Sequence, residues 1–300
     1  MTNDHRLAYL IMAHSDPQHL SRLTRSLAAS GDVFVHLDGK ARTDAFHEHL
    51  SRQPEVHIVE PRVPVAWAGI SQVDASLTLI RSAIAHCADY GHLILLSGSC
   101  YPLRSQREIG KFLGSHRGRE FIRYIDMREG PEHYMPQINR KWFKEPFYRG
   151  ESRFRTFADR AFRRGLNNLG LANQWPRNLV PYFGSNWWAI TSNCARYILD
   201  YLKNNPEYYC INKQTFSPDE HFFHTLIGNS RFHMNATGLQ AYQGRGTWRM
   251  ANLHMIHPSL QKWYTLADWK EVVASDKLFI RKVSTEKSTA LLDRIDTELH

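Results

Sequence analysis

Short apolar runs alternate with amphipathic segments along the first third of the chain. Each run is continuous, is too short for a typical helix and ends at polar or turn-forming residues, which is the pattern of a buried strand. Between the runs, spacings such as Leu20, Leu23 and Leu27 place apolar side chains on one helical face. The expected strands are residues 7–13, 33–37, 56–59 and 93–96, and the expected helices are residues 20–29 and 73–85. This alternation predicts an α/β fold with a Rossmann-like, mostly parallel sheet flanked by helices.

Three polar loops follow predicted strands. His14, Asp38 and Ser97 each come directly after an apolar run. The carboxyl ends of parallel strands meet at one edge of a sheet, and ligands of open α/β sheets bind there. We therefore expect the three loops to border a common ligand site.

The rest of the chain divides into a basic middle segment and a final part that returns to strands and helices. From residue 104 the sequence is basic and aromatic, with turn signals at Gly130-Pro131 and Glu145-Pro146. Later, residues 187–190 predict a strand, and residues 194–202, 218–227 and 288–298 predict helices. We expect a single domain over residues 1–300, in which residues 104–177 form a basic helical insertion.

Composition narrows the class of protein. With 300 residues, 42% of them hydrophobic, the chain can bury one large core. Its start lacks the pattern of a signal peptide, and no apolar run approaches the ~20 residues that span a bilayer. Its four cysteines have no Cys-x-x-Cys spacing, which favours a reduced chain over a disulfide framework or a structural zinc site. These features predict a cytoplasmic protein.

Positive charge is concentrated in the middle segment. Residues 104–177 hold 17 Lys and Arg against 8 Asp and Glu, an excess that equals the net charge of +9 for the whole chain. Such a segment attracts nucleotide phosphates, anionic lipid headgroups or nucleic acid. On charge alone, a solvated basic surface without a specific partner explains the segment equally well.

Several common nucleotide and metal motifs are missing from the sequence. Neither G-x-G-x-x-G nor G-x-x-x-x-G-K-[ST] occurs, which disfavours nicotinamide enzymes and P-loop NTPases. His221 and His224 have helical spacing, but H-E-x-x-H is missing, so packed histidines are expected rather than a zinc site. No Asp-x-Asp pair could hold a divalent ion between nucleotide phosphates. A bound diphosphate would instead be neutralised by Arg and Lys.

Six stretches occur in the order found in one known family. Segment Trp67-Ala-Gly-Ile-Ser71 resembles the W-G-x-x-S signature of the core-2/I-branching β-1,6-N-acetylglucosaminyltransferases (glycosyltransferase family 14) and the related peptide O-xylosyltransferases, with Ala68 in the glycine position. The other five stretches are residues 33–38, 95–102, 184–188, 217–225 and 278–282. Around Cys100 the pattern Ser-Cys-x-Pro-Leu is similar to that of plant members. The chain is identified as a soluble, bacterial member of this family.

The resemblance implies a GT-A type glycosyltransferase fold, a UDP-sugar donor, a glycan acceptor, inversion at the anomeric carbon, and no metal or other cofactor. Glu220 matches the family's catalytic base, and Asp219 beside it is expected to bind substrate. A carboxylate must take the proton of the acceptor hydroxyl as that oxygen attacks the anomeric carbon. From position alone, Glu220 could equally be an acid that caps a helix.

The resemblance also implies residues that hold the donor. Lys282 matches the basic residue of an F-A-R-K motif and Arg281 its neighbour, and both would stabilise charge on the departing UDP. The family's matching loops place donor contacts at His14, Asp38, Trp67 and Ser97, and sugar contacts at Asn186 and Trp187. The competing interpretations are a turn residue for Asp38, a core side chain for Trp187 and a surface pair for Arg281 and Lys282.

One arginine of the xylosyltransferase pattern falls on Gln240 in this chain. Either Arg245 or Arg249, a few residues later, is expected to supply its charge. With these assignments, residues 1–103 form the nucleotide-binding half and residues 178–300 the acceptor and catalytic half.

A bacterial member of the family suggests transfer of GlcNAc, xylose or a similar sugar during surface polysaccharide assembly. The acceptor would then be lipid-linked or anionic, and the basic segment 104–177 would contact it or the inner membrane peripherally. No nucleic acid is expected as a partner of such an enzyme. The alternative is a non-catalytic basic module that binds anionic membrane or nucleic acid through residues 104–177. A zinc hydrolase is a more distant alternative.

Overall fold

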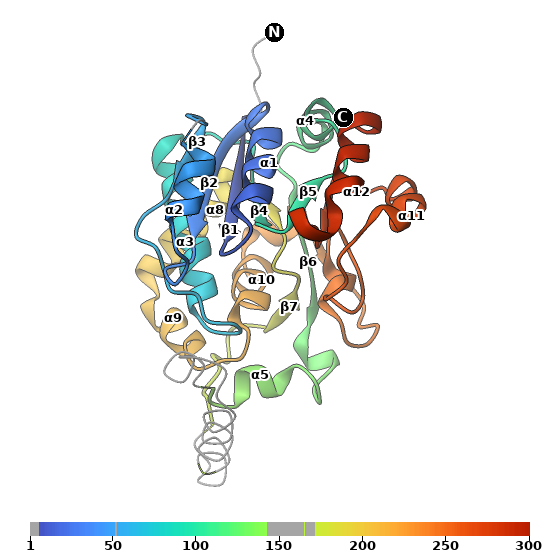
Figure 1. The fold of residues 1–300 in the computed structure, drawn as a ribbon. Coiled ribbons are helices and arrows are strands. Elements are labelled where there is room, and N and C mark those ends of the chain that lie inside the picture. Colours follow the sequence, from blue (N-terminus) through green and yellow to red (C-terminus); the bar gives the residue numbers. More distant parts are fainter. Residues whose placement is uncertain (1–5, 52, 143–164, 166–171) are drawn as a thin grey trace.

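A computed structural model of the protein describes residues 6–51, 53–142, 165 and 172–300. An eight-stranded sheet lies at its centre in the order β3-β2-β1-β4-β8-β6-β7, and β9 pairs with β6. The strands are β1 (Leu7–Ala13), β2 (Gly31–Leu37), β3 (Val56–Ile58), β4 (His92–Ser97), β6 (Glu120–Asp126), β7 (Tyr182–Gly184), β8 (Ala189–Ile190) and β9 (Ala236–Leu239). The first four strands in sheet order are parallel, whereas β8 is antiparallel to both of its neighbours. The predicted α/β fold with helices around a mostly parallel sheet is confirmed (Figure 1).

The parallel strands end together, which brings three loops to one edge of the sheet. Strand β1 pairs with β2 as far as Ala13 opposite Leu37, and with β4 as far as Met12 opposite Ser97. The polypeptide therefore leaves these strands at His14, Asp38 and Ser97 along a single edge. This confirms the predicted placement of the three loops at the carboxyl ends of their strands.

Alternate residues of each strand pack against different helices. In β1, Tyr9 and Ile11 belong to the same buried cluster as side chains of α1, α2 and α12, whereas Ala8 and Leu10 join a second cluster with α3, α8 and α10. The helices are α1 (Pro17–Ala28), α2 (Asp44–Leu50), α3 (Ser71–His86), α8 (Ser192–Asn204), α10 (Phe222–Gly228) and α12 (Thr285–Glu298). The continuous apolar runs of the sequence follow from this burial on both faces.

A small second sheet connects the end of the chain to the carboxyl edge. It has the order β10-β11-β5, from β10 (His254–Ile256), β11 (Phe279–Arg281) and β5 (Cys100–Pro102). Strand β11 is antiparallel to β5, with Arg281 opposite Cys100. Because β5 follows β4 after the turn at Gly98 and Ser99, this pairing places the end of β11 beside the loop after β4.

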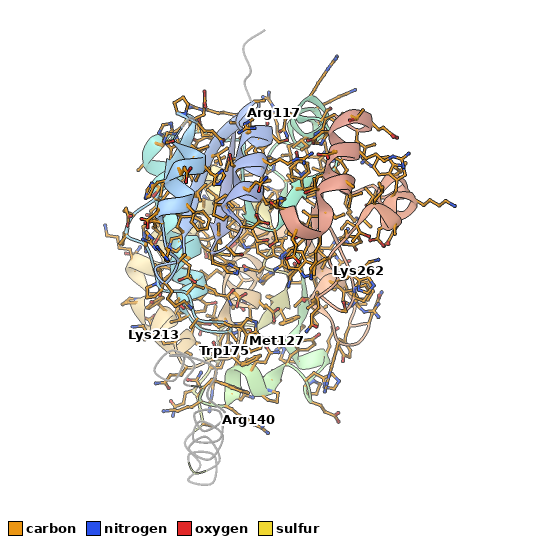
Figure 2. The ribbon with its side chains drawn as sticks, in the orientation of Figure 1. Arg117, Met127, Arg140, Trp175, Lys213 and Lys262 are labelled. Atoms are coloured by element: carbon orange, nitrogen blue, oxygen red, sulfur yellow. The ribbon has the colours of Figure 1, made fainter. Side chains whose placement is uncertain are left out.

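The remaining elements lie around the two sheets. They are α4 (Gln106–Ser115), α5 (Met135–Asn139), α9 (Pro206–Asn212), α11 (Trp269–Ala274) and the 3₁₀ helices η1 (Met127–Glu129), η2 (Pro218–Glu220), η3 (Arg231–Asn235), η4 (Thr247–Met250) and η5 (Leu266–Asp268). Met127 belongs to a third buried cluster with Tyr134 and Phe183, against which Trp175 packs (Figure 2). Across the described residues, every helix falls short of the length or apolar character that a bilayer crossing requires.

Part of the predicted basic insertion lies outside the described residues, which omit 143–164 and 166–171. In its described part, α4 begins with a capping box between Ser105 and Glu108. Strand β6 also belongs to this segment, and it pairs with β7, β8 and β9 in the central sheet. The segment 104–177 thus supplies one strand of the core as well as the basic sequence that follows.

Two predicted elements differ from the structure at functionally relevant places. The expected helix over residues 218–227 is divided into η2 and α10, because Glu220 and His221 donate backbone hydrogen bonds to carbonyls only three residues back. Ser217, with φ of 48°, starts this tighter turn. The expected strand over residues 187–190 is shorter, since only Ala189 and Ile190 pair in the sheet.

Candidate active site

A cavity of about 320 Å³ lies where the carboxyl edge of the sheet meets η2 and the end of β11. Residues from four of the six motif stretches line it. Of the residues predicted to be functional, the cavity brings together Trp67, Asn186, Trp187, Asp219, Glu220, Arg281 and Lys282. It also includes side chains that were not predicted, namely Gln72, Ser185, Phe216, Ser217, Thr247, Ile256 and Leu260. Ser185 and Ser217 stood inside motif stretches, whereas Phe216, Ile256 and Leu260 carried no chemical signal.

The loop that carries Trp67 is shaped by the residues of its motif. Ala68, which stands where the family signature has glycine, has φ of 59°, in the left-handed region that glycine adopts with least strain. The Ser71 hydroxyl accepts a hydrogen bond from the Ala66 amide at 2.8 Å, which closes the turn. The carbonyl of Ala68 accepts a hydrogen bond from the Ser217 amide at 3.1 Å. The W-G-x-x-S loop is thereby fixed to the start of η2, which carries the two acids.

Asp219 and Glu220 form the acidic side of the cavity. Asp219 is only 6% exposed, and its Oδ1 has no hydrogen-bond partner among the described residues. Burial raises the pKa of Asp219 to about 7. Burial and, secondarily, the neighbouring Asp219 carboxylate raise the pKa of Glu220 well above its ordinary value. The two carboxyls interact, so they titrate as a pair.

Arg281 and Lys282 form the basic side of the cavity. The Arg281 Nε donates a hydrogen bond to the Ser97 Oγ at 3.1 Å, and its guanidinium lies 4.9 Å from the centre of the Trp187 ring. The Lys282 ammonium lies 5.7 Å from the centre of the Trp263 ring. Burial lowers the pKa of both side chains, and the charge of Arg281 lowers that of Lys282 further. Within the described part of the chain neither cation is in an ion pair, so their charge is available to an anion in the cavity.

Aromatic rings and one amide complete the lining. Trp67 is 62% exposed and contacts Phe216 edge to face at a centroid distance of 5.8 Å. Asn186 is buried, yet its Oδ1 has no partner among the described residues. Buried oxygens without partners are uncommon in folded proteins, and those of Asn186 and Asp219 both belong to residues of this cavity. Together they suit a ligand that offers hydroxyl groups and an apolar ring face.

The loop before Trp187 depends on a close backbone contact. Gly184 lies so near the His224 ring that a Cβ at this position would be 2.5 Å from His224 Cδ2. His224 is buried, its pKa is lowered by burial to about 3, and its Nε2–H donates to the Ser185 carbonyl at 3.0 Å. The neutral imidazole therefore holds the loop that places Asn186 and Trp187 in the cavity. This explains the Gly-Ser-Asn-Trp sequence in physical terms.

The predicted residues of the three strand-end loops do not line the cavity directly. His14 is exposed after β1. Asp38 accepts hydrogen bonds from the amides of Lys40 at 2.8 Å and Val65 at 3.2 Å, so it orders the loop that leads to Trp67. Ser97 acts through its contact with Arg281. The contacts that the three residues were predicted to make with a nucleotide stay predictions.

Neither candidate for the additional arginine lines the cavity. Arg245 and Arg249 are both exposed, Arg245 donating to His133 Nδ1 and Arg249 lying 4.4 Å from the centre of the Trp248 ring. Thr247, between them, does line the cavity. Gln240, where the family pattern has arginine, donates its side-chain amide to backbone carbonyls at the end of β9, including that of Gly238 at 3.1 Å. The choice between Arg245 and Arg249 therefore stays open.

A larger hollow, of about 790 Å³, lies between α1 and α12. One of its cations, Arg22, is already paired with Asp293 and Asp296 at 2.7 and 2.6 Å. The Tyr101 hydroxyl donates to the same Asp296 at 2.7 Å. Since these charges compensate one another, the smaller cavity beside η2 is the better candidate for chemistry.

The cavity thus combines two acids whose pKa values are raised with two cations that have no ion pair among the described residues. Aromatic rings and an amide also line it. A carboxylate of this kind can accept a proton from a hydroxyl nucleophile. The cations can stabilise negative charge on a leaving group. The arrangement is suited to a displacement in which an alcohol attacks and an anion departs.

Comparison with known proteins agrees with this chemistry. The family model described as Core-2/I-Branching enzyme matches residues 7–289. A human N-acetyllactosaminide β-1,6-N-acetylglucosaminyl-transferase is 28% identical over 226 residues, which are 73% of this chain and 52% of the human protein. A mouse β-1,3-galactosyl-O-glycosyl-glycoprotein β-1,6-N-acetylglucosaminyltransferase 4 is 23% identical over 75% of this chain and 47% of its own length. A β-1,3-galactosyl-O-glycosyl-glycoprotein β-1,6-N-acetylglucosaminyltransferase of bovine herpesvirus 4 is 23% identical over 74% of this chain and 47% of its own length. The chain thus spans about half the length of the curated relatives it matches.

Proposed function

Because the chain belongs to the Core-2/I-branching enzyme family, we propose that it transfers a sugar from a UDP-sugar to a hydroxyl group of a glycan acceptor. The names of its relatives favour GlcNAc as that sugar, with xylose as the next candidate. The α/β architecture is consistent with a GT-A-like fold. One observation carries the proposal: Glu220 lines the same cavity as Arg281 and Lys282, two cations without an ion pair to any described residue. No observation on the described residues favours the alternative of a non-catalytic basic module.

The proposed reaction is a single displacement with inversion at the anomeric carbon. Glu220, as a carboxylate, accepts the proton of the acceptor hydroxyl while that oxygen bonds to the anomeric carbon. The bond between this carbon and the UDP oxygen breaks, and its electron pair leaves with UDP. Arg281 and Lys282 stabilise the charge that develops on the diphosphate. The free Oδ1 of Asp219 and Oδ1 of Asn186 accept hydrogen bonds from sugar hydroxyls.

The base should impose a pH dependence on transfer. Because the pKa values of Asp219 and Glu220 are both raised, the pair is partly protonated below neutral pH and loses its protons as the pH rises. We therefore expect kcat/KM to increase between about pH 6 and pH 8. Asp219→Asn removes the neighbouring charge and should move this rise to lower pH. A pH–rate profile of both proteins tests this, and a profile that is flat, or unchanged in the variant, would argue against Glu220 as the base.

We also propose that transfer needs no metal ion, since the cations of the cavity can neutralise the diphosphate. Activity should then survive an excess of EDTA. The measurement is initial-rate transfer in matched buffers with EDTA, Mg²⁺ or Mn²⁺. Strict dependence on Mn²⁺ would contradict the assignment of Arg281 and Lys282 as the groups that hold the diphosphate.

Donor recognition is tested by thermal shift with UDP, UDP-GlcNAc, UDP-xylose, UDP-glucose and UDP-glucuronate. A ligand that binds only the folded protein raises its melting temperature by mass action, by an amount that corresponds to ~2.7 kcal/mol at a hundred times Kd. We expect UDP and UDP-GlcNAc to raise it. A melting temperature that responds to none of the five compounds, together with salt-sensitive binding to DNA or anionic vesicles, would instead support the basic-module alternative.

The wider setting of the reaction extends the same proposal. A cytoplasmic location, a lipid-linked or anionic acceptor, and peripheral contact with a bacterial inner membrane all stay predictions from the sequence. They depend largely on the basic segment 104–177, of which residues 143–164 and 166–171 lie outside the described structure.

A further inference from the structure

Two histidines and an aspartate meet at the opposite end of the sheet from the proposed active site. Asp32 is the second residue of β2, His57 lies in β3, and His86 is the last residue of α3. One ligand atom from each of the three lies within 4.8 Å of the others. Asp38 follows the other end of β2, so the length of the strand separates this cluster from the carboxyl edge. The catalytic proposal gives these side chains no role.

Surrounding residues hold two of the three side chains in place. The His57 ring stacks on Phe34 at a centroid distance of 5.0 Å and an interplanar angle of 25°, and it contacts the His86 ring at 4.5 Å. The Tyr90 hydroxyl donates a hydrogen bond to the Asp32 Oδ2 at 2.6 Å. Hydrogen bonds of this kind orient carboxylate ligands around metal ions. His86 is exposed, so the cluster is open to solvent on its side.

Arg6 at present provides the positive charge at this site. Its Nε lies 2.7 Å from the Asp32 Oδ2, and its Nη2 donates to Oδ1 at 3.0 Å. The Arg6 side chain is 49% exposed, so solvent screens this ion pair and another cation can reach the carboxylate. An incoming metal ion would compete with Arg6 for the carboxylate and would gain the two imidazoles as well.

We propose that Asp32, His57 and His86 form a binding site for a divalent transition metal, with Zn²⁺ as the best match. Two imidazoles and one carboxylate are a donor set that zinc prefers and that Mg²⁺ and Ca²⁺ do not. Tetrahedral zinc with bonds of ~2.0–2.1 Å needs donor atoms ~3.4 Å apart. The three donor atoms already lie within 4.8 Å of one another, so small side-chain rotations, chiefly of the exposed His86, would bring them to this spacing.

A water molecule can complete the coordination. The ion would join β2, β3 and the end of α3. Its expected effect is therefore on the stability of this edge of the fold, and sugar transfer does not depend on it.

Zinc binding is tested on the untagged, metal-free protein by calorimetric titration with Zn²⁺ and by melting temperature with and without Zn²⁺. The test variant is His57→Gln/His86→Gln. The matched control is His47→Gln/His49→Gln, which removes two exposed imidazoles from α2. We expect the wild type and the control to bind one Zn²⁺ and to melt at a higher temperature with it. The test variant should bind at least ~10-fold more weakly and show no such rise.

Two further variants separate loss of a ligand from loss of the fold. His86→Gln changes only an exposed side chain, and its melting temperature without metal should equal that of the wild type while its Zn²⁺ affinity falls. Arg6→Ala frees the Asp32 carboxylate and should bind Zn²⁺ more tightly. The proposal is overturned if the wild type binds no Zn²⁺, if the control loses binding as the test variant does, or if Arg6→Ala weakens binding. With Co²⁺ in place of Zn²⁺, the wild type should give the visible spectrum of a four-coordinate ion, and the test variant should not.

Discussion

Glu220→Gln is expected to lower the turnover of sugar transfer by at least ~10²-fold while UDP binding stays nearly unchanged. The amide has almost the same shape as the carboxylate, so the cavity keeps its form, but an amide cannot accept the acceptor's proton. The effect should be large because burial and the Asp219 charge raise the pKa of Glu220, which makes its ionised form a strong proton acceptor. Turnover is measured as product formed from a UDP-sugar, and UDP binding by calorimetry.

The matched control for this experiment is Glu207→Gln. Glu207 is an exposed acid in the first turn of α9 and does not line the cavity. The Glu207→Gln variant should retain full turnover, which would show that loss of one carboxylate charge does not by itself lower the turnover. If Glu220→Gln turned over at the rate of the wild type, Glu220 could not be the base. The remaining interpretation would be the structural one, an acid at the start of a helical turn.

Lys282→Ala should lower turnover by roughly 10²-fold or more, because a cation aimed at a leaving group acts mainly when negative charge develops there. The described structure places Lys282 beside Arg281 with no carboxylate paired to either, so no neighbouring acid would offset its effect. Separate determination of kcat and KM distinguishes this from simple affinity for UDP.

Lys213→Ala is the control for the loss of a lysine. Lys213 is exposed directly after α9, 5.0 Å from the centre of the Tyr209 ring and outside the cavity (Figure 2). Its variant should be indistinguishable from the wild type in both kinetic constants. A Lys282→Ala variant that changed KM alone would show that the lysine binds the ground state and does not stabilise the departing UDP.

The part of the fold that could be predicted is the part in which one local pattern decides the structure. Strands β1 and β4 are continuous apolar runs because both of their faces are buried. Helix α1 was predicted over residues 20–29 from its apolar spacing. It begins three residues earlier, at Pro17, where Asp16 accepts a hydrogen bond from the His19 amide. Parallel strands in turn fix the edge at which their loops meet, so this edge could be predicted too.

The antiparallel part of the sheet and the small second sheet could not be predicted in the same way. Strand β8 is reduced to Ala189 and Ile190, and β11 to Phe279–Arg281, so neither has enough residues for a periodicity. Their pairings join segments far apart in the chain, as between β11 and β5. Tertiary packing determines which distant segments pair, and the β-propensity of a short segment says little about its partner.

For the site, sequence motifs identified the polar groups but not the whole enclosure. Asp219 and Glu220 could be located because their stretch has a family pattern, whereas the turn that aims them depends on Ser217 in a left-handed conformation. Phe216 and Leu260 line the cavity only because of where the fold places them. The position of a long exposed side chain such as Arg245 or Arg249 depends on neighbours that a sequence pattern does not show.

Transfer of a sugar in the absence of metal is the most direct test of the central claim, that Glu220 is the base of a metal-free displacement from a UDP-sugar. Wild-type protein and Glu220→Gln are incubated with UDP-GlcNAc, a glycan acceptor and excess EDTA, and UDP and the glycosylated product are quantified. We predict equal amounts of UDP and product from the wild type and almost none from the variant. Equal product from both proteins, or transfer by the wild type only after Mn²⁺ is restored, would contradict the account.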